Sequence, residues 1–199
     1  MSQITQDQVK SLREMTGAGI MDCKRALTEC DGDIDKAKDH LRKKGVAVAD
    51  KKAARETSQG AVGHYIHMGG KVGVLVEISC ETDFVAKNDD FQELLRDVAM
   101  HVAAMNPLCV SRDEVPSDVL DREKEIFRDQ SIKEGKPENI LDKIVDGRVE
   151  KFYKERCLLD QAFVKDDSKT IQELVTAAIA KIGENIQVKR FARFEVGQA

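Results

Sequence analysis

The segment between residues 72 and 80 constrains the fold of this 199-residue chain more than any other. Apolar side chains occupy every second position in it, at Val72, Val74, Val76, Ile78 and Cys80. This alternation places them on one face of a β-strand, and water must be kept from that face. A strand-like stretch from 61 to 68 and two glycines at 69 and 70 precede the segment. Because glycine tolerates a positive φ, the pattern predicts a β-hairpin.

Two later segments repeat apolar residues at helical spacing and are suited to cover the strand. The first lies between residues 91 and 105, and we expect Asp89 or Asp90 to cap this helix. The second lies between residues 171 and 182. Alternation returns between residues 186 and 196 and predicts a third strand. A small antiparallel sheet packed with helices is an α+β fold.

The stretch between the two covering helices is strongly polar. We predict one long exposed helix from Pro116 to about Glu134 and a second helix after Pro137. The second helix carries an apolar stripe that can pack on the first as an antiparallel helical hairpin. That stripe consists of Ile140, Ile144, Val145, Val149 and Phe152.

Three short helices are predicted within the first 46 residues. The first begins after Thr5 and ends at Gly17, the second follows residue 20, and the third is capped by Asp33 and ends at Gly45. So small a bundle buries only about 60% of the surface of its unfolded chain. We therefore expect a marginal module that is suited to docking on a partner.

Positive charge is concentrated between residues 36 and 55, where eight Lys or Arg stand against two Asp, although the whole chain carries −4. No aromatic residue is interleaved there to stack on bases. We interpret residues 47–60 as a basic linker between an N-terminal module (1–46) and an α+β core (61–199). The alternative is a nucleic-acid adaptor that uses the basic segment, which requires RNA binding with a steep salt dependence.

Cysteine and histidine usage argues against a disulfide framework and against a metal centre. The five cysteines are an odd number in a chain without an export signal, which predicts reduced and mostly buried thiols; they are Cys23, Cys30, Cys80, Cys109 and Cys157. His64 and His67 fall on opposite faces of the predicted strand, so they cannot share a metal ion.

No segment has the roughly 18 apolar residues of a membrane helix. We therefore expect a cytoplasmic protein without cofactors.

Two connections hold residues of uncertain role. Ile20 and Met21 stand beside two glycines between the first helices. They either cover the core of the small bundle, which is the commoner role, or offer an apolar knob to a partner, with Lys10 and Arg13 as polar flanks.

Phe84 lies in the second connection, between strand and helix, among polar residues. An exposed Phe sacrifices roughly 2 kcal/mol of burial, so physics alone favours a ring tucked under the helix. The commonest role of the neighbouring Asp83 is to stabilise a turn.

At these two connections the sequence resembles the elongation factor Ts family, in its short form with a single core. The first shared motif is Thr16-Gly17-Ala18-Gly19-Ile20-Met21-Asp22-Cys23-Lys24. A second motif spans Glu77 to Lys87, and the ending from Arg193 to Gly197 is also similar. The resemblance covers essentially the whole chain, with the motifs in the family's order.

The resemblance implies a guanine nucleotide exchange factor for elongation factor Tu, without covalent chemistry. Such a factor binds Tu·GDP, disturbs the Mg²⁺ and phosphate site, promotes GDP release and is displaced when GTP binds. Its N-terminal module is ubiquitin-associated-like and docks on the nucleotide-binding domain of Tu through positions that are here Lys10, Arg13, Ile20 and Met21. Many members have Met at the position of Ile20.

The second motif is implied to dislodge the magnesium ion by inserting its aromatic ring between side chains of Tu. Its residues here are Thr82, Asp83, Phe84 and Val85. Short members compensate for their single core by pairing two chains. We therefore expect a homodimer in a Tu2Ts2 assembly that pairs through the uncovered side of the sheet, with no membrane and no direct nucleic-acid contact.

An enzyme is the competing interpretation. It would use Cys80 as a nucleophile, assisted by His64, His67 or His101. Two carboxylates follow Cys80 in the sequence and would raise its pKa, which argues against a reactive thiol.

Overall fold

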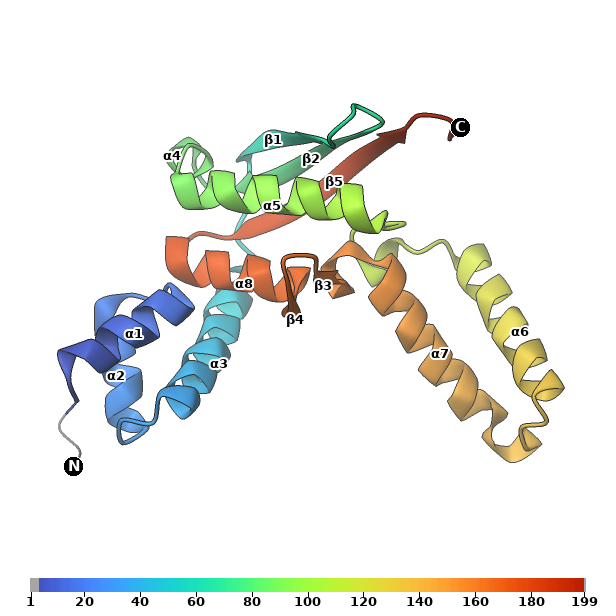
Figure 1. Ribbon diagram of the computed structural model, residues 1–199, viewed down its shortest axis with the longest axis horizontal. Helices are drawn as coiled ribbons and strands as arrows, with labels where there is room; N and C mark the ends of the chain where they lie inside the picture. The colour runs from blue at the N-terminus through green and yellow to red at the C-terminus, as the bar shows by residue number, and fades with distance from the viewer. Residues whose placement is uncertain (1–3, 199) are drawn as a thin grey trace. The chain divides into compact units, whose positions relative to one another are not determined.

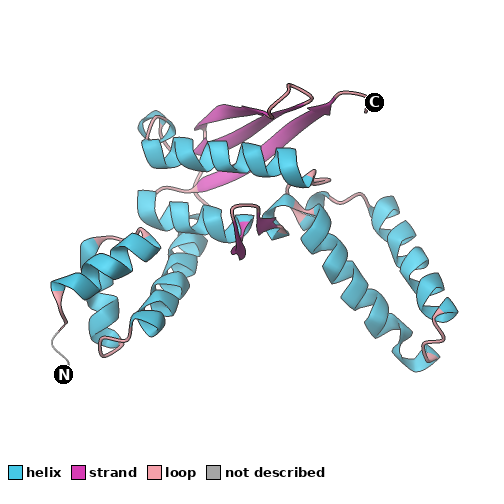
Figure 2. Cartoon of the chain, viewed as in Figure 1, coloured by secondary structure: helices cyan, strands magenta, loops and turns pink. Residues whose placement is uncertain are grey.

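The computed structural model describes residues 4–198 and has the predicted α+β fold (Figure 1). A three-stranded antiparallel sheet has the order β1-β2-β5, and a two-stranded sheet pairs β3 with β4 (Figure 2). The strands are β1 (Gln59–Ile66), β2 (Val72–Cys80), β3 (Ala162–Phe163), β4 (Asp166–Thr170) and β5 (Ile186–Glu195). The helices are α1 (Gln6–Thr16), α2 (Ile20–Glu29), α3 (Ile34–Lys52), α4 (Asp83–Ala86), α5 (Asp89–Met105), α6 (Ser117–Lys133), α7 (Leu141–Arg156) and α8 (Ile171–Ile182).

The chain forms two compact units, each assembled from separate stretches of sequence. The first combines residues up to 61 with 78–94 and 173–187, and the second combines 62–77, 95–172 and the residues from 188 on. The boundaries between the units therefore pass through the three strands of the larger sheet and through the helices α5 and α8.

Local signals fix the ends of the first helices. Thr5 and Gln8 form a capping box at the start of α1, and Gly17 ends that helix with a φ of 67°. The predicted cap of α3 is confirmed, because the side chain of Asp33 accepts a hydrogen bond from the amide of Lys36 at 3.0 Å. The buried core of this bundle consists of Leu12, Cys23, Ala26, Leu27 and Ala37.

The predicted end of α3 at Gly45 is wrong, since the helix continues to Lys52. Gly45 is buried, and a Cβ at this position would lie 3.6 Å from that of Ala180. A glycine inside a helix costs only about 1 kcal/mol, and the following residues, rich in alanine and lysine, favour a helix. Residues 47–52, assigned to a linker from the sequence, are thus helical.

The hairpin of β1 and β2 has a longer connection than the two-residue turn that the glycines suggested. His67 donates its amide to the carbonyl of Val72 at 2.9 Å, and the amide of Gly70 donates to His67 at 2.9 Å. Gly69 and Gly70 have φ values of 89° and 68°, which explains why glycine occupies both positions. The apolar face of β2 is buried as predicted, with Val74, Val76, Ile78 and Cys80 at 1% exposure or less.

Helix α5 packs on β1 at Gly63, because a Cβ built there would lie 2.4 Å from the side chain of Leu95. The expected cap residues, Asp89 and Asp90, instead form the first turn of α5. Asn88 takes the capping role, since its side chain accepts a hydrogen bond from the amide of Asp90 at 2.8 Å.

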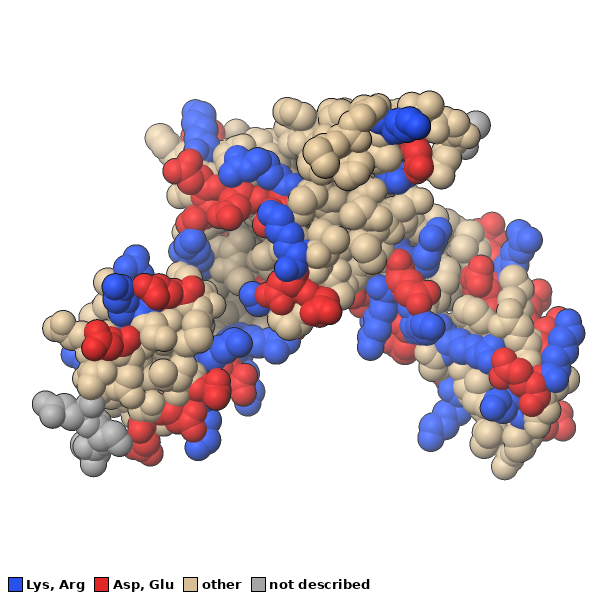
Figure 3. All heavy atoms as spheres, viewed as in Figure 1, with Lys and Arg blue, Asp and Glu red and all other residues tan. Residues whose placement is uncertain are grey.

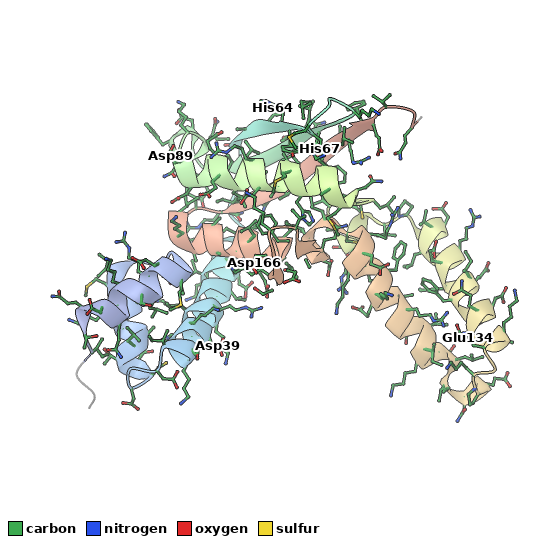
Figure 4. All side chains as sticks on the ribbon, viewed as in Figure 1. Asp39, His64, His67, Asp89, Glu134 and Asp166 are labelled. Carbon is green, nitrogen blue, oxygen red and sulfur yellow. The ribbon has the colours of Figure 1, made fainter. Side chains whose placement is uncertain are left out.

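Helices α6 and α7 form the predicted hairpin, and basic and acidic side chains alternate over its surface (Figure 3). Near its turn, where Glu134 lies (Figure 4), this carboxylate accepts from Arg148 of α7 at 2.8 Å. The two ends of the hairpin meet at its base. The amide of Leu108 donates to the carbonyl of Arg156 at 2.7 Å, and that of Leu158 donates to Cys109 at 3.0 Å.

Alanine substitutions at two glycines should distinguish the cost of a steric clash from the gain in helix propensity. We expect Gly63→Ala to lower the free energy of unfolding by roughly 1–3 kcal/mol, because the new methyl group collides with Leu95. Gly147→Ala in α7 meets no neighbouring atom and should raise it by roughly 0.5–1 kcal/mol. Urea denaturation measures both, and equal effects of the two substitutions would contradict the packing at β1.

Candidate functional site

The connection after β2 is not an irregular loop but contains the four-residue helix α4. Thr82 is its N-cap, and the Thr82 hydroxyl accepts a hydrogen bond from the amide of Val85 at 3.4 Å. The ring of Phe84 is 82% exposed, so it does not tuck under α5 as burial energy alone suggested. Asp83 pairs with Lys87 one turn later at 2.8 Å, and this partner lowers the pKa of the Asp83 carboxyl. Val85 is half-buried.

Glu184 supports this corner from a distant part of the sequence. Its carboxylate accepts hydrogen bonds from the amides of Glu81 at 3.1 Å and Thr82 at 3.0 Å, and from the Thr82 hydroxyl at 2.7 Å. The residue lies between α8 and β5, and no local sequence pattern connects it with residues 81 and 82. A glutamate beside a predicted strand start is the only signal that the sequence offered.

Glu81 makes the reciprocal contact. Its carboxylate accepts a hydrogen bond from the amide of Asn185 at 2.6 Å and lies 3.5 Å from the guanidinium of Arg55. The hydrogen bond from Asn185, with the charge of Arg55, holds the pKa of Glu81 below its ordinary value. Asn185 is itself 2% exposed and donates its side-chain amide to the carbonyl of Arg55 at 2.8 Å. The corner after β2 (residues 81–82) and the corner before β5 (residues 184–185) are thus joined by a network of charge-assisted hydrogen bonds.

The second candidate surface lies on the N-terminal helices. Ile20 and Met21, the first residues of α2, are 54% and 69% exposed. Lys10 and Arg13 on α1 are exposed as well. The core of the small bundle is therefore closed by other residues, and Ile20 and Met21 remain available as an apolar knob. This surface and the corner at Phe84 both belong to the first compact unit.

The surroundings of Cys80 do not suit a nucleophile. The side chain is buried, and its thiol donates to the carbonyl of Thr82 at 3.1 Å. Burial, followed by the nearby charge of Glu184, raises the pKa of the thiol. His101 is also buried, and it is engaged at its two ring nitrogens by Gln161 and by the amide of Val164.

His64 lies on β1 and His67 in the loop that follows (Figure 4). Across residues 4–198 there is no group of three or more His, Cys, Asp or Glu side chains that could hold a metal ion. All five cysteines are free thiols, and four of them are buried. None of the helices in the described part of the chain is both long and apolar enough to cross a membrane.

Comparison with known proteins identifies the family. The sequence model of the elongation factor Ts family matches residues 34–198. Elongation factor Ts of Syntrophomonas wolfei is 60% identical over 195 residues, which cover 98% of this chain and 91% of the relative. The relative from Desulfosudis oleivorans is 57% identical over 198 residues and the full length of both chains. The chain belongs to the elongation factor Ts family.

Family membership confirms the resemblance inferred from the two motifs. Elongation factor Ts of Geobacter sulfurreducens is 58% identical over 195 residues, which cover 98% of this chain and 90% of the relative, so the N-terminal helices of this chain are part of the similarity too. Within this family member, the side chains of Met21 and Phe84 are both exposed on one chain.

Removing the Glu81 carboxylate should give a pH-dependent loss of stability. Because the folded-state pKa of Glu81 is lowered, its contribution is fully present above the ordinary glutamate pKa of about 4.3 and disappears as the pH falls through the folded value. We expect Glu81→Gln to unfold more easily than the unaltered chain at pH 7, and the two proteins to converge at acidic pH. Urea titrations between pH 3 and pH 7 measure this.

The matched control is Glu138→Gln, which removes an exposed carboxylate before α7. It should change the free energy of unfolding by less than about 0.5 kcal/mol. If the free energies of unfolding of Glu81→Gln and the unaltered protein differed more at acidic pH than at pH 7, the lowered pKa assigned to Glu81 would be contradicted.

Proposed function

We propose that this chain is the guanine nucleotide exchange factor of elongation factor Tu and acts in the cytoplasm during translation elongation. The observation that carries the proposal is the 82% exposed ring of Phe84 on a braced strand-to-helix corner, in a member of the elongation factor Ts family. A ring kept in water at a cost of roughly 2 kcal/mol is well suited to insertion into a partner.

The exchange reaction needs no covalent step. Elongation factor Tu holds GDP through backbone amides and a magnesium ion. A factor that binds better to the form of Tu in which these contacts are disturbed therefore lowers the affinity of Tu for GDP. Insertion of Phe84, with Thr82, Asp83 and Val85 around it, displaces the groups that hold the metal. Because the coupling is reciprocal, GTP that enters the emptied site expels the factor.

The N-terminal helices provide affinity in this mechanism. Met21 and Ile20 dock on the nucleotide-binding domain of Tu, and Lys10 and Arg13 provide polar contacts at the rim. These positions are taken over from the family motif, and their exposure makes them available for docking. The module of residues 1–46 would then be the anchor, while residues 61–199 carry the exchange element and the dimer contact.

Dimerisation is proposed through the side of the large sheet that α5 does not cover. Residues that alternate with the buried ones on the strands leave an apolar surface in water, which marks an association site. Its exposed members in the second unit are Val62, Ile66, Leu75 and Phe194. Two chains that pair through these faces would form a two-fold assembly that binds two molecules of Tu.

Truncation of the ring tests the exchange mechanism. We expect Phe84→Ala to fold normally and to lower the saturating rate of GDP release from Tu roughly thirtyfold, which corresponds to about 2 kcal/mol. Release of a fluorescent GDP measures the rate. Ile132→Ala, which shortens an exposed side chain on α6, is the control and should retain the rate. Full stimulation by Phe84→Ala would refute the proposed role.

A charge on the apolar knob should affect association. We expect Met21→Asp to raise the dissociation constant for nucleotide-free Tu by a factor of roughly 30, because a buried contact of about 2 kcal/mol is lost. Titration calorimetry measures the constant. The matched control is Met68→Asp, a substitution at a side chain that is 88% exposed in the hairpin loop of the second unit. Equal affinities of the two variants for Tu would contradict the proposal that Met21 docks on Tu.

Light scattering tests the dimer. The unaltered protein should have twice the 22.2 kDa mass of one chain, and Leu75→Glu should shift it to a monomer, because a charge would be buried against the second copy. Val164→Glu, at a site 46% exposed between β3 and β4, is the control and should remain dimeric. A monomeric unaltered protein would exclude this pairing.

A further inference from the structure

We infer that Glu184 is a positioning residue for nucleotide exchange, which acts by orienting the hydroxyl of Thr82 and thereby the short helix that presents Phe84. The inference rests on the proposed function and assigns a role to a residue outside the family motif at 77–87.

The first step is the convergence of three donors on one carboxylate. One oxygen of Glu184, Oε2, accepts hydrogen bonds from the amides of Glu81 and Thr82, at 3.1 and 3.0 Å. The other, Oε1, accepts the hydroxyl proton of Thr82 at 2.7 Å. The end of β2 is therefore held against the segment between α8 and β5 at both its backbone and its side chain.

The second step concerns the single proton of the Thr82 hydroxyl. Because that proton is donated to Glu184, the lone pairs of Oγ1 remain for the amide of Val85, which donates at 3.4 Å. This is the N-cap hydrogen bond of α4. Without the acceptor at Glu184, the Thr82 side chain would be free to leave this χ1 rotamer, and its oxygen would cap the helix only part of the time.

The third step is the dependence of Phe84 on this cap. Helix α4 has four residues, and a helix this short is unstable without tertiary support. The ring of Phe84 contributes no such support, because it is 82% exposed. The direction in which the ring points therefore depends on the cap at one end of α4 and on the packing of Ala86, which is 8% exposed, at the other.

The position of Glu184 is itself fixed by its neighbour. The amide of Asn185 donates to Glu81 at 2.6 Å, while the Asn185 side chain donates to the carbonyls of Ala53 and Arg55 at 3.3 and 2.8 Å. Glu184 thus directly precedes a residue that is held by three hydrogen bonds, so its carboxylate can transmit a defined orientation to Thr82.

Glu184→Gln tests the inference with little change in shape. The amide keeps a carbonyl oxygen for the backbone N–H groups, but its NH₂ group cannot accept the proton of Thr82. We expect the saturating rate of GDP release from Tu to fall roughly tenfold, while the concentration of factor at half-saturation changes less than about twofold. Release of a fluorescent GDP at several factor concentrations separates the two quantities.

Substitutions at Thr82 provide the matched pair. Thr82→Ser retains the hydroxyl, whereas Thr82→Val has the shape of threonine without it, and we expect Thr82→Ser to release GDP roughly tenfold faster than Thr82→Val. The double variant Glu184→Gln/Phe84→Ala should be no slower than Phe84→Ala alone, because Glu184 acts through the ring. A general loss of stability would instead add to the effect of Phe84→Ala.

The outcomes distinguish this inference from the proposed function. Full stimulation by Phe84→Ala refutes the proposed function itself. A slow Phe84→Ala together with an unimpaired Glu184→Gln overturns only the role of Glu184, and so does an additive double variant. If circular dichroism shows that Glu184→Gln is unfolded, equal rates for Thr82→Val and Thr82→Ser overturn the inference.

Discussion

The carboxylate of Glu184 and its three hydrogen-bond donors are the constraint on which the candidate exchange site depends. The contact crosses 102 positions of sequence and joins the end of β2 to the start of β5. Because Glu81 makes the reciprocal bond to Asn185, neither corner can move without breaking charge-assisted hydrogen bonds. A four-residue helix obtains a rigidity here that its own length could not provide.

Regular periodicity explains which parts of the fold were predictable. The alternation from Val72 to Cys80 and the stripe from Phe91 to Val102 reflect burial on one face, and the structure buries these faces as expected. The cap at Asp33 was readable because its side chain satisfies an amide three residues away. The family was also readable, because its two motifs are contiguous in the sequence.

Features without a period were missed. Helix α4 is too short to show one, and β4 consists of polar residues from Asp166 to Thr170. The choice of Asn88 over Asp89 as a cap depends on where α4 ends, which the sequence did not reveal. Glu184 could not be connected with Thr82 because only the folded sheet brings the two together. For Phe84, the general preference for burial gave the wrong orientation, whereas the family resemblance implied the exposed one.

The base of the α6–α7 hairpin has a consequence for how this fold can vary. Backbone hydrogen bonds pair Leu108 with Arg156 and Cys109 with Leu158, so the hairpin departs from and returns to the rest of the second unit at adjacent points. A chain segment whose two ends are hydrogen-bonded to each other can be lengthened, shortened or exchanged with little effect on the structure around it. The hairpin is thus a natural place for lineages to insert new recognition elements, while the sheet and the corner at Thr82 stay unchanged.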